Sequence, residues 1–258
     1  MLLFRGAFSH AVISAPSGGT VCHTASLIFC GRSGVFMKSI PLLPPDAPLW
    51  FPPAEEASPE GVVAAGADLS PERLVFAYAS GLFPWYSEET PILWWSPDPR
   101  CVLFTKEAHI PRRLSRTIRH GRFSFTFDTI FDRIIEHCAT VPRSGRPGTW
   151  LLPEMITAYK EMHKLGLAHS VETWEELEGK KQLVGGLYGL QLGHAFFGES
   201  MFHLRPDASK AAVAALVAVC QELDIAIIDC QQTTAHMLRF GAREIPRDHF
   251  LKLLRYLV

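Results

Sequence analysis

"DASKAAVAALVAVCQELDIAIIDCQ", residues 207–231, decides the fold class because it joins a helix pattern to a strand pattern. Residues 207–224 are apolar nearly all round, which predicts a buried helix. Residues 225–229 form a short apolar run that predicts a central strand. Three earlier segments read as successive strands: residues 168–174, 182–190 and 193–202. Strands followed by strand, helix and strand indicate an α/β (α+β) protein.

The overall composition narrows the class of protein. The chain has 258 residues, of which 48% are hydrophobic, enough for a core in one large domain or two smaller ones. The formal net charge is −1, so a nucleic-acid contact would need a local basic patch. The 6 cysteines are scattered without a CxxC motif, which favours a reducing cytoplasm. No apolar run approaches the roughly 18 residues of a membrane-spanning helix.

The first 36 residues differ from the rest of the chain. They are rich in Ser, Gly and Ala and contain no acidic residue. His10 and Pro16 interrupt the apolar region that a secretory signal would need. We therefore expect residues 1–36 to be a poorly ordered N-terminal extension, with the working chain beginning at Met37.

"GLFPWYSEETPILWWSPDPR", residues 81–100, is an aromatic loop. A helix is predicted just before it, because Ser70 is a good N-cap, Pro71 suits the first helical position and Gly81 can end the helix. The loop places its tryptophans among turn-forming residues, where they could pack in the core or present a rigid surface to a flat ligand. The tryptophans are Trp85, Trp94 and Trp95.

An arginine-rich helix is predicted between residues 109 and 120. Its apolar residues recur every four positions, and its basic residues fall on the opposite side. The apolar residues are Ile110, Leu114 and Ile118, and the basic ones are Arg112, Arg116 and Arg119, with Arg113 at the edge. This side is either a solvated helix surface or a contact for the phosphates of a nucleic acid, which position it without reading its sequence.

Two acidic residues lie in apolar strand segments. Asp229 ends such a strand, and it is either a structural anchor for loop amides or a functional group. Gln231 adds an amide that both donates and accepts hydrogen bonds. Glu199 is expected to bind either a cation of a substrate or a buried arginine. Cys230 and His236 are too few for a metal site.

A set of motifs in fixed order resembles the leucyl/phenylalanyl-tRNA–protein transferase family. The resemblance runs from about Pro45 to the C-terminus, some four-fifths of the chain. It rests on "SPEGVVAAGADLSPERLVFAY", "GLFPWYSEETPILWWSPDPR", "GTW", "LVGGLYG", "FFGESMF", "DASK" and "IIDCQ". Four positions depart from the family pattern, since Ala67 replaces a glycine, His203 a serine, Thr234 an asparagine found in some members and Leu187 a methionine found in some relatives.

The resemblance implies a function and a fold. Members of the family move leucine or phenylalanine, sometimes methionine, from aminoacyl-tRNA to an N-terminal arginine or lysine of a protein, which marks that protein for N-degron degradation. They need no metal and no acyl-CoA. The resemblance also implies a small N-terminal domain, here residues 37–100, a catalytic domain like the GNAT acyltransferases, here residues 101–258, and a monomer in the cytoplasm.

The resemblance further implies a set of site residues. The aminoacyl-adenosine site falls on Tyr78, Trp85 and Trp150. The catalytic groups fall on Glu199, Asp229 and Gln231. The pocket for the amino-acid side chain falls on Leu187, Met201, Val213, Leu216 and Ile228. Arg112, Arg113, Arg116 and Arg119 would contact tRNA phosphates. Our hypothesis is that Asp229 orients or helps deprotonate the attacking amine, while Gln231 holds the reacting groups.

Two other functions are considered. An acetyltransferase that uses acyl-CoA would need a glycine-rich pyrophosphate loop before a helix, and "LQLGHAFFG", residues 190–198, does not supply one. A noncatalytic RNA-binding module would bind RNA through the arginines and tryptophans, but Glu199 and Asp229 would then have no function.

Overall fold

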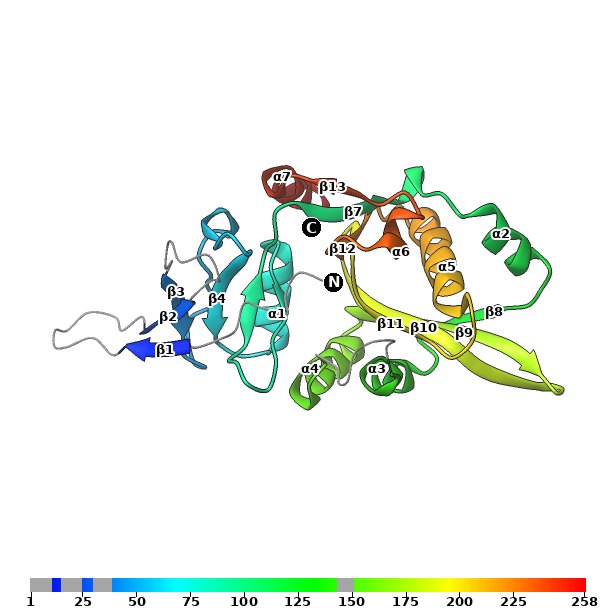
Figure 1. Cartoon of the computed structure of the whole chain (residues 1–258), viewed down its shortest axis with the longest axis horizontal. Helices are drawn as coiled ribbons and strands as arrows, with labels where there is room; N and C mark the ends of the chain where they lie inside the picture. Colours follow the sequence, from blue (N-terminus) through cyan, green and yellow to red (C-terminus); the bar gives the residue numbers. More distant parts are fainter. Residues whose placement is uncertain (1–10, 15–24, 30–38, 143–150) are drawn as a thin grey trace. The chain divides into compact units, whose positions relative to one another are not determined.

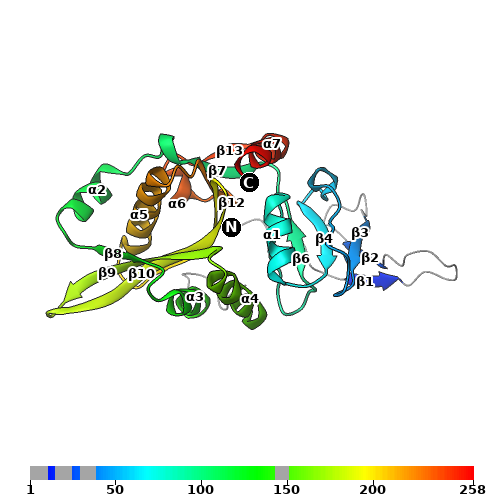
Figure 2. The same cartoon turned by 180° about the vertical axis from the view of Figure 1, so that it is seen from behind.

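The computed structural model describes residues 11–14, 25–29, 39–142 and 151–258. The chain divides into two compact units. The first unit comprises Met1–Pro99 and Pro246–Lys252, and the second comprises Arg100–Ile245 and Leu253–Val258. Figures 1 and 2 label the elements from two sides. No helix among the described residues is long and apolar enough to cross a membrane.

The first unit contains a sheet with the strand order β1-β2-β3-β4-β6-β5. Only β3 and β4 pair in parallel, and the other neighbours are antiparallel. Its elements are β1 (Ala11–Ser14), β2 (Ala25–Phe29), β3 (Ser39–Leu43), the 3-10 helix η1 (Ala54–Glu56), β4 (Val62–Gly66), α1 (Pro71–Ala79), β5 (Phe83–Pro84) and β6 (Leu93–Trp95).

Two of these strands lie within the predicted N-terminal extension. β1 pairs with β2 from Ala11 opposite Phe29 to Ser14 opposite Ser26. The other residues of the 1–36 segment lie outside the described residues. Its disorder therefore stays a prediction.

The N-terminus of α1 confirms the predicted capping. The Ser70 hydroxyl accepts a hydrogen bond from the backbone N–H of Arg73 at 3.4 Å, and Pro71 is the first helical residue. Gly81, with a φ of 79°, follows the helix end as expected. Ala67, at a position where the family pattern has glycine, has a φ of 62°. This left-handed conformation explains why glycine suits the position.

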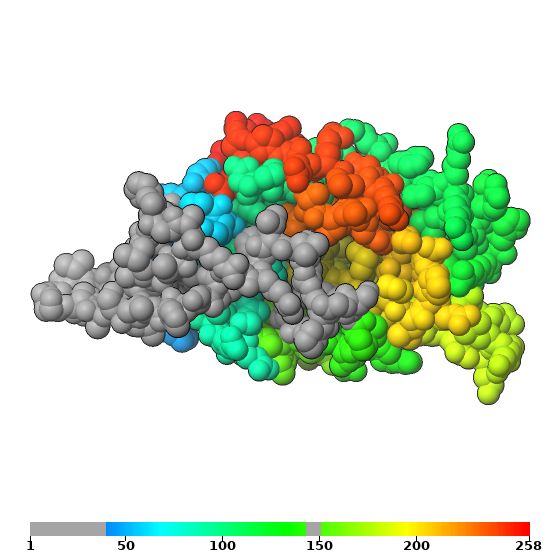
Figure 3. All heavy atoms as spheres, in the orientation of Figure 1, coloured from blue at the N-terminus to red at the C-terminus, as the bar shows by residue number. Residues whose placement is uncertain are grey.

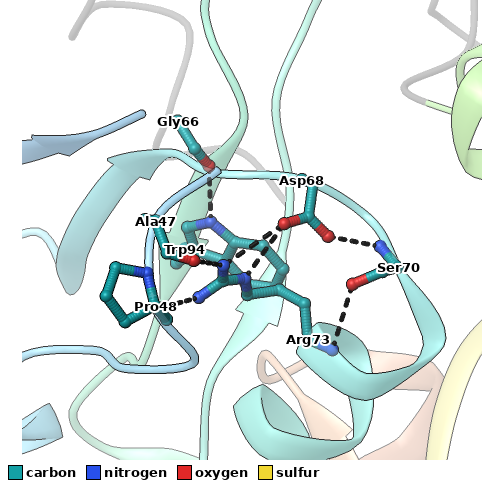
Figure 4. A network of polar contacts seen from close by, with 7 residues as sticks. All are labelled: Ala47, Pro48, Gly66, Asp68, Ser70, Arg73 and Trp94. Atoms are coloured by element: carbon teal, nitrogen blue, oxygen red, sulfur yellow. Dashed lines mark hydrogen bonds and ion pairs between the residues drawn. The ribbon is translucent and has the colours of Figure 1, made fainter. Parts of the chain in front are cut away.

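The guanidinium of Arg73 anchors the segment before β4 (Figure 4). It donates hydrogen bonds to the carbonyl oxygens of Pro48 and Ala47 at 2.8 and 2.6 Å, and it pairs with the Asp68 carboxylate at 3.2 Å. Nearby, Trp94 Nε1 donates to the Gly66 carbonyl at 2.9 Å. These bonds satisfy polar groups that would otherwise be buried without partners.

The second unit is built around a sheet with the strand order β13-β7-β12-β11-β10-β9-β8. The pairing of β11 with β12 is parallel, and the others are antiparallel. Its elements are β7 (Arg100–Phe104), the 3-10 helix η2 (Thr105–Glu107), α2 (Arg112–Arg119), β8 (Ser124–Phe127), α3 (Phe131–Thr140), α4 (Pro153–Lys164), β9 (Ala168–Leu177), β10 (Lys180–Leu192), β11 (Ala195–His203), α5 (Ala208–Glu222), β12 (Ile227–Gln231), α6 (Ala235–Leu238) and β13 (Arg243–Ile245). Helix α7 (Arg247–Leu257) has residues in both units.

The β11–α5–β12 connection confirms the pattern read from residues 207–231. α5 covers one face of the sheet, and α3 and α4 cover the other (Figures 1 and 2). The side of α5 that faces the sheet is apolar and buried, including Ala211, Val213 and Val217. The chain is therefore an α/β protein with a mixed sheet. The likeness to GNAT acyltransferases stays a prediction.

Candidate active site

Glu199 and Gln231 lie on the neighbouring strands β11 and β12 and are joined by a hydrogen bond. Gln231 Nε2 donates to Glu199 Oε1 at 2.8 Å. The Tyr159 hydroxyl, on α4, donates to the other carboxylate oxygen, Oε2, at 3.0 Å. The exposed fraction of Glu199 is only 9%. Three elements thus hold this carboxylate in one orientation, with donors on both of its oxygens.

Asp229 forms an ion pair with Arg100, the first residue of β7. Arg100 Nε and Nη2 donate to Asp229 Oδ1 and Oδ2 at 2.9 and 2.6 Å. Neither side chain is exposed to solvent. The bidentate geometry is the strongest arrangement available to this pair of groups. Asp229 Oδ1 also accepts a hydrogen bond from the backbone N–H of Gln231 at 2.8 Å.

The end of β12 departs from regular strand geometry. Its register with β7 shifts between Asp229 and Gln231, as at a β-bulge. Gln231 has a φ of 60°, in the left-handed region that non-glycine residues rarely occupy. Such a conformation persists only where the surroundings impose it. Here the Asp229 carboxylate holds the backbone of Gln231 and the Glu199 carboxylate holds its side chain.

The structure brings the three predicted catalytic residues together within the second unit. Asp229 acts as the anticipated anchor of a loop amide and also pairs with an arginine. The partners of Glu199 include Tyr159 and Gln231. Sequence reasoning missed Arg100 and Tyr159. Tyr159 lies on the buried side of α4 with Met155 and Met162, a position that in sequence does not differ from that of an ordinary core residue.

The predicted side-chain pocket residues pack against one apolar cluster. Leu187 on β10 pairs directly with Met201 on β11. Met201 is partly buried, and the other four are buried within the cluster between the sheet and α5. The five residues are Leu187, Met201, Val213, Leu216 and Ile228. The structure therefore gathers these side chains, which approach from β10, β11, α5 and β12, into one apolar region.

The tryptophans of the aromatic loop divide into two kinds. Trp94 and Trp95 are buried, at 0% and 2% exposure, so their role is packing. Trp85 is half-buried, and its ring centroid lies 5.4 Å from that of Trp95. Trp95 Nε1 donates a hydrogen bond to the Trp85 carbonyl at 2.6 Å. Of the other predicted aminoacyl-adenosine residues, Tyr78 on α1 is buried and Trp150 lies outside the described residues.

Helix α2 has the predicted amphipathic arrangement. Leu114 is buried, and Ile110 and Ile118 pack against the core of the second unit. The arginines are all exposed: Arg112, Arg113, Arg116 and Arg119. The segment that carries them reaches the molecular surface in the space-filling view (Figure 3). Their contact with tRNA stays a prediction.

The sequence matches two domain families over most of its length. Residues 102–255 match "Leucyl/phenylalanyl-tRNA protein transferase". Residues 67–98 match "Leucyl/phenylalanyl-tRNA protein transferase N-terminal domain". The two matches lie in the same order as the two units of the structure.

Curated proteins with the name leucyl/phenylalanyl-tRNA–protein transferase are close in sequence. One from Nitratidesulfovibrio vulgaris is 55% identical over 213 residues, which are 83% of this chain and 89% of that protein. One from Oleidesulfovibrio alaskensis is 54% identical over 207 residues, covering 80% and 84%. Among solved structures, FemX aligns with a TM-score of 0.46 and 8% identity over 95% of this chain and 90% of FemX, too low a likeness to support an argument.

Proposed function

The chain belongs to the leucyl/phenylalanyl-tRNA–protein transferase family, and we propose that it joins leucine or phenylalanine to proteins that begin with arginine or lysine. Its activity is the transfer of an aminoacyl group from tRNA to a protein, an acyltransferase reaction. The observation that carries the proposal is Gln231, held in a left-handed conformation between Glu199 and Asp229. We further propose that the product is marked for N-degron degradation, and that the enzyme acts in the cytoplasm as a monomer.

The chemistry needs positioning more than activation. The aminoacyl ester of tRNA is already an activated acyl donor, so the amine of the acceptor can attack it directly without a covalent enzyme intermediate. The protein must hold an unprotonated amine against the ester carbonyl and support the oxyanion that develops. Correct alignment alone can lower the barrier by several kcal/mol.

The proposed role of Asp229 is to orient its neighbour. Both of its carboxylate oxygens accept hydrogen bonds from Arg100, and Oδ1 also accepts one from Gln231. A fully buried carboxylate with this set of donors is better suited to fix a backbone than to take a proton from the amine. This favours orientation over deprotonation, the two roles that the sequence leaves open. Substrate-assisted proton transfer, through the amine itself or a ribose hydroxyl, then completes the step.

Gln231 and Glu199 are the proposed groups nearest the reaction. The Gln231 amide can donate to a developing oxyanion or accept from an amine, and its position is fixed at both backbone and side chain. The Glu199 carboxylate would bind the positive charge of the acceptor or the amine of the aminoacyl group. Tyr159 would keep the carboxylate of Glu199 in place during these contacts.

The apolar cluster around α5 is the proposed pocket for the leucine or phenylalanine side chain. Its residues supply no charged group, which suits an aliphatic or aromatic hydrocarbon side chain such as those of leucine and phenylalanine. Apolar pockets distinguish substrates that differ by a methylene by only about 1–3 kcal/mol. Some transfer of methionine is therefore expected as well.

The tRNA contacts are proposed on two sets of residues. Trp85, with Tyr78 and Trp150, would bind the terminal adenosine, and a stacked base gains about 1–3 kcal/mol. The exposed arginines of α2 would hold acceptor-stem phosphates, which makes tRNA binding sensitive to salt and largely insensitive to sequence.

One assay tests the function directly. The protein is incubated with radiolabelled Phe-tRNA and a protein that begins with arginine, in the absence of CoA. Transfer of label supports the proposal, and the same acceptor with an N-terminal alanine should remain unlabelled. A requirement for acetyl-CoA would favour an acetyltransferase, and tRNA binding without transfer would favour an RNA-binding module.

The arginine helix has its own test. The double substitution Arg112→Ala and Arg116→Ala removes two proposed phosphate contacts. We expect weaker tRNA binding and a salt dependence shallower by about two counterions. Arg255→Ala, an exposed arginine on α7, is the matched control and should leave both quantities unchanged. Equal tRNA affinity of the double variant and the wild type would refute this assignment.

A further inference from the structure

Two cysteines lie on neighbouring strands beside the candidate active site. Cys101 follows Arg100 on β7, and Cys230 lies between Asp229 and Gln231 on β12. Each cysteine is therefore adjacent in sequence to one partner of the buried Arg100–Asp229 ion pair. All four cysteines in the part of the chain that the structure describes with side chains are free thiols.

The register shift in β12 brings the two thiols together. Asp229 pairs with Val102 and Gln231 pairs with Cys101, so Cys230 is the extra residue of the bulge. Two residues of the bulged strand then oppose Cys101 on β7. Cys101 belongs to the apolar cluster that faces α5, and Cys230 packs against that cluster. The Cys230 thiol donates a hydrogen bond to the backbone carbonyl of Ile228 at 3.6 Å.

The two thiols differ in access and in acidity. Cys101 is fully buried, whereas Cys230 is half-buried. The neighbouring Cys230 side chain lowers the pKa of Cys101, and this outweighs the opposing effect of burial. The hydroxyl of Thr233 also lowers it, while the charges of Asp229 and Glu244 act in the opposite direction. The pKa of Cys230 is raised, first by its interaction with Cys101 and then by burial.

We propose that Cys101 and Cys230 form a dithiol site that a low-molecular-weight disulfide oxidises to an intramolecular disulfide, and that this oxidation slows aminoacyl transfer. The site is a thiol modification site beside the acyl-transfer groups. The effect on transfer rests on the function proposed above, whereas formation of the disulfide does not.

The reaction follows ordinary thiol–disulfide exchange. The sulfur of Cys230, the less buried of the two residues, attacks one sulfur of oxidised glutathione, and one glutathione leaves as a thiolate. The Cys101 thiolate then attacks the Cys230 sulfur of this mixed disulfide and expels the second glutathione. Two protein thiols are oxidised to one disulfide, the glutathione disulfide is reduced to two thiols, and the two protons pass to the released thiolates. The first step is expected to be slow, because the Cys230 thiol resists ionisation.

The disulfide is expected to affect catalysis through Gln231, the residue that follows Cys230. A disulfide bond fixes its two sulfur atoms about 2.0 Å apart, much closer than two sulfur atoms that are only in van der Waals contact. The strain falls on the bulge, where Gln231 is already in a left-handed conformation. Because a displacement of 1 Å in a catalytic group can cost roughly a hundredfold in rate, a loss on the order of tenfold is expected here.

The test uses the full chain with oxidised glutathione as the probe. The reduced protein is treated with the probe, digested without reductant and analysed by mass spectrometry. We expect the two peptides that carry Cys101 and Cys230 to be joined, with the loss of two hydrogen atoms. Phenylalanine transfer should fall on the order of tenfold and return after dithiothreitol is added.

Two variants distinguish oxidation of the Cys101–Cys230 dithiol site from oxidation of other cysteines. Cys230→Ala removes the sulfur that reacts first and should retain transfer activity before and after treatment, and Cys230→Ser serves the same purpose if the alanine variant does not fold. Cys138→Ala removes a buried cysteine on α3 and is the matched control, which should lose activity on oxidation as the wild type does.

Three results would overturn the proposal. In the first, Cys101 and Cys230 both remain open to alkylation after treatment with oxidised glutathione. In the second, the disulfide forms and transfer is unchanged. In the third, Cys230→Ala loses activity on oxidation as the wild type does. Lack of transfer by the fully reduced protein would instead refute the proposed function, since the peptide analysis does not depend on activity.

Discussion

Each unit of the molecule contains an arginine–aspartate ion pair, and the two pairs differ in burial and in the sequence separation of their partners. In the first unit Arg73 and Asp68 are 5 residues apart, and their side chains are 3% and 33% exposed. In the second unit Arg100 and Asp229 are 129 residues apart, and both side chains are fully buried. Each pair also has a left-handed residue close by, Ala67 in the first unit and Gln231 in the second.

The comparison shows how one pair of chemical groups can serve two purposes. Arg73 donates its remaining hydrogen bonds to backbone carbonyls, so its pair closes a local loop before α1 (Figure 4). Asp229 instead accepts from the backbone of Gln231, so its pair fixes the residue that we place at the reaction. The first pair, whose carboxylate is partly exposed, is expected to contribute less to stability, whereas a fully buried pair becomes costly when one partner is lost.

Breaking the buried Arg100–Asp229 ion pair should have the largest effect on the stability of the protein. Arg100→Met leaves the Asp229 carboxylate buried without a cation, which should lower the free energy of unfolding by about 3–5 kcal/mol. Urea denaturation followed by circular dichroism measures this change. The double variant Arg100→Met with Asp229→Leu removes both charges and should regain most of the lost stability, because a well-packed apolar pair can replace an ion pair.

The same double variant also tests the functional half of the comparison. It should fold but transfer phenylalanine at a rate lowered by roughly a hundredfold, since nothing then holds the Gln231 backbone. Normal transfer by a folded double variant would show that the second pair is as purely structural as the first.

The sequence predicted the elements whose pattern is local. The apolar run of residues 207–224 contains α5, and residues 225–229 overlap β12. Glu199, Asp229 and Gln231 were identifiable because a polar group in an apolar strand costs free energy unless it has a binding partner or a function. These predictions needed only the pattern of residues that are close together in the sequence.

The sequence could not predict contacts that depend on tertiary pairing. Arg100 precedes a short apolar strand and its partner lies 129 residues away, so no neighbour in the sequence marks it as a member of a buried ion pair. Tyr159 looked like an ordinary member of an apolar helix side until α4 packed near β11. The left-handed conformation of Gln231 has no signal in the sequence, because glutamine does not favour it.

The two residues in the left-handed conformation, Gln231 and Ala67, allow a second test of the difference between the two units. Gln231→Gly should lower transfer by roughly a hundredfold, because it removes the side chain that we place at the reaction. The free energy of unfolding should change by less than about 1 kcal/mol, since relief of the left-handed conformation offsets the lost hydrogen bond to Glu199. Transfer kinetics and urea denaturation of the same preparation measure both effects. A large loss of stability with normal transfer would contradict the assignment.

Ala67→Gly is the matched change in the first unit. Glycine adopts a φ of 62° without strain, so the free energy of unfolding should rise by about 1 kcal/mol. Transfer should be unchanged, because Ala67 supports only the local loop beside Asp68. Thermal denaturation and the transfer assay check the two statements. A loss of transfer comparable with that of Gln231→Gly would remove the distinction between the two regions.

The smallest expected effect is the pH dependence of the half-exposed pair. Burial raises the pKa of Asp68, but hydrogen bonds from Ser70 and the charge of Arg73 outweigh it, so the net shift is downward from 3.8. A carboxyl whose pKa is lowered in the folded state stabilises the protein above its ordinary pKa, and this contribution is lost as the pH falls through the lower folded value. Asp68→Asn should therefore be less stable than the wild type near pH 6, by less than about 1 kcal/mol, and the difference should shrink below pH 3.8. Urea denaturation of both proteins between pH 6 and pH 3 measures it, and a difference that does not change with pH would show that the Asp68 charge contributes nothing to the first pair.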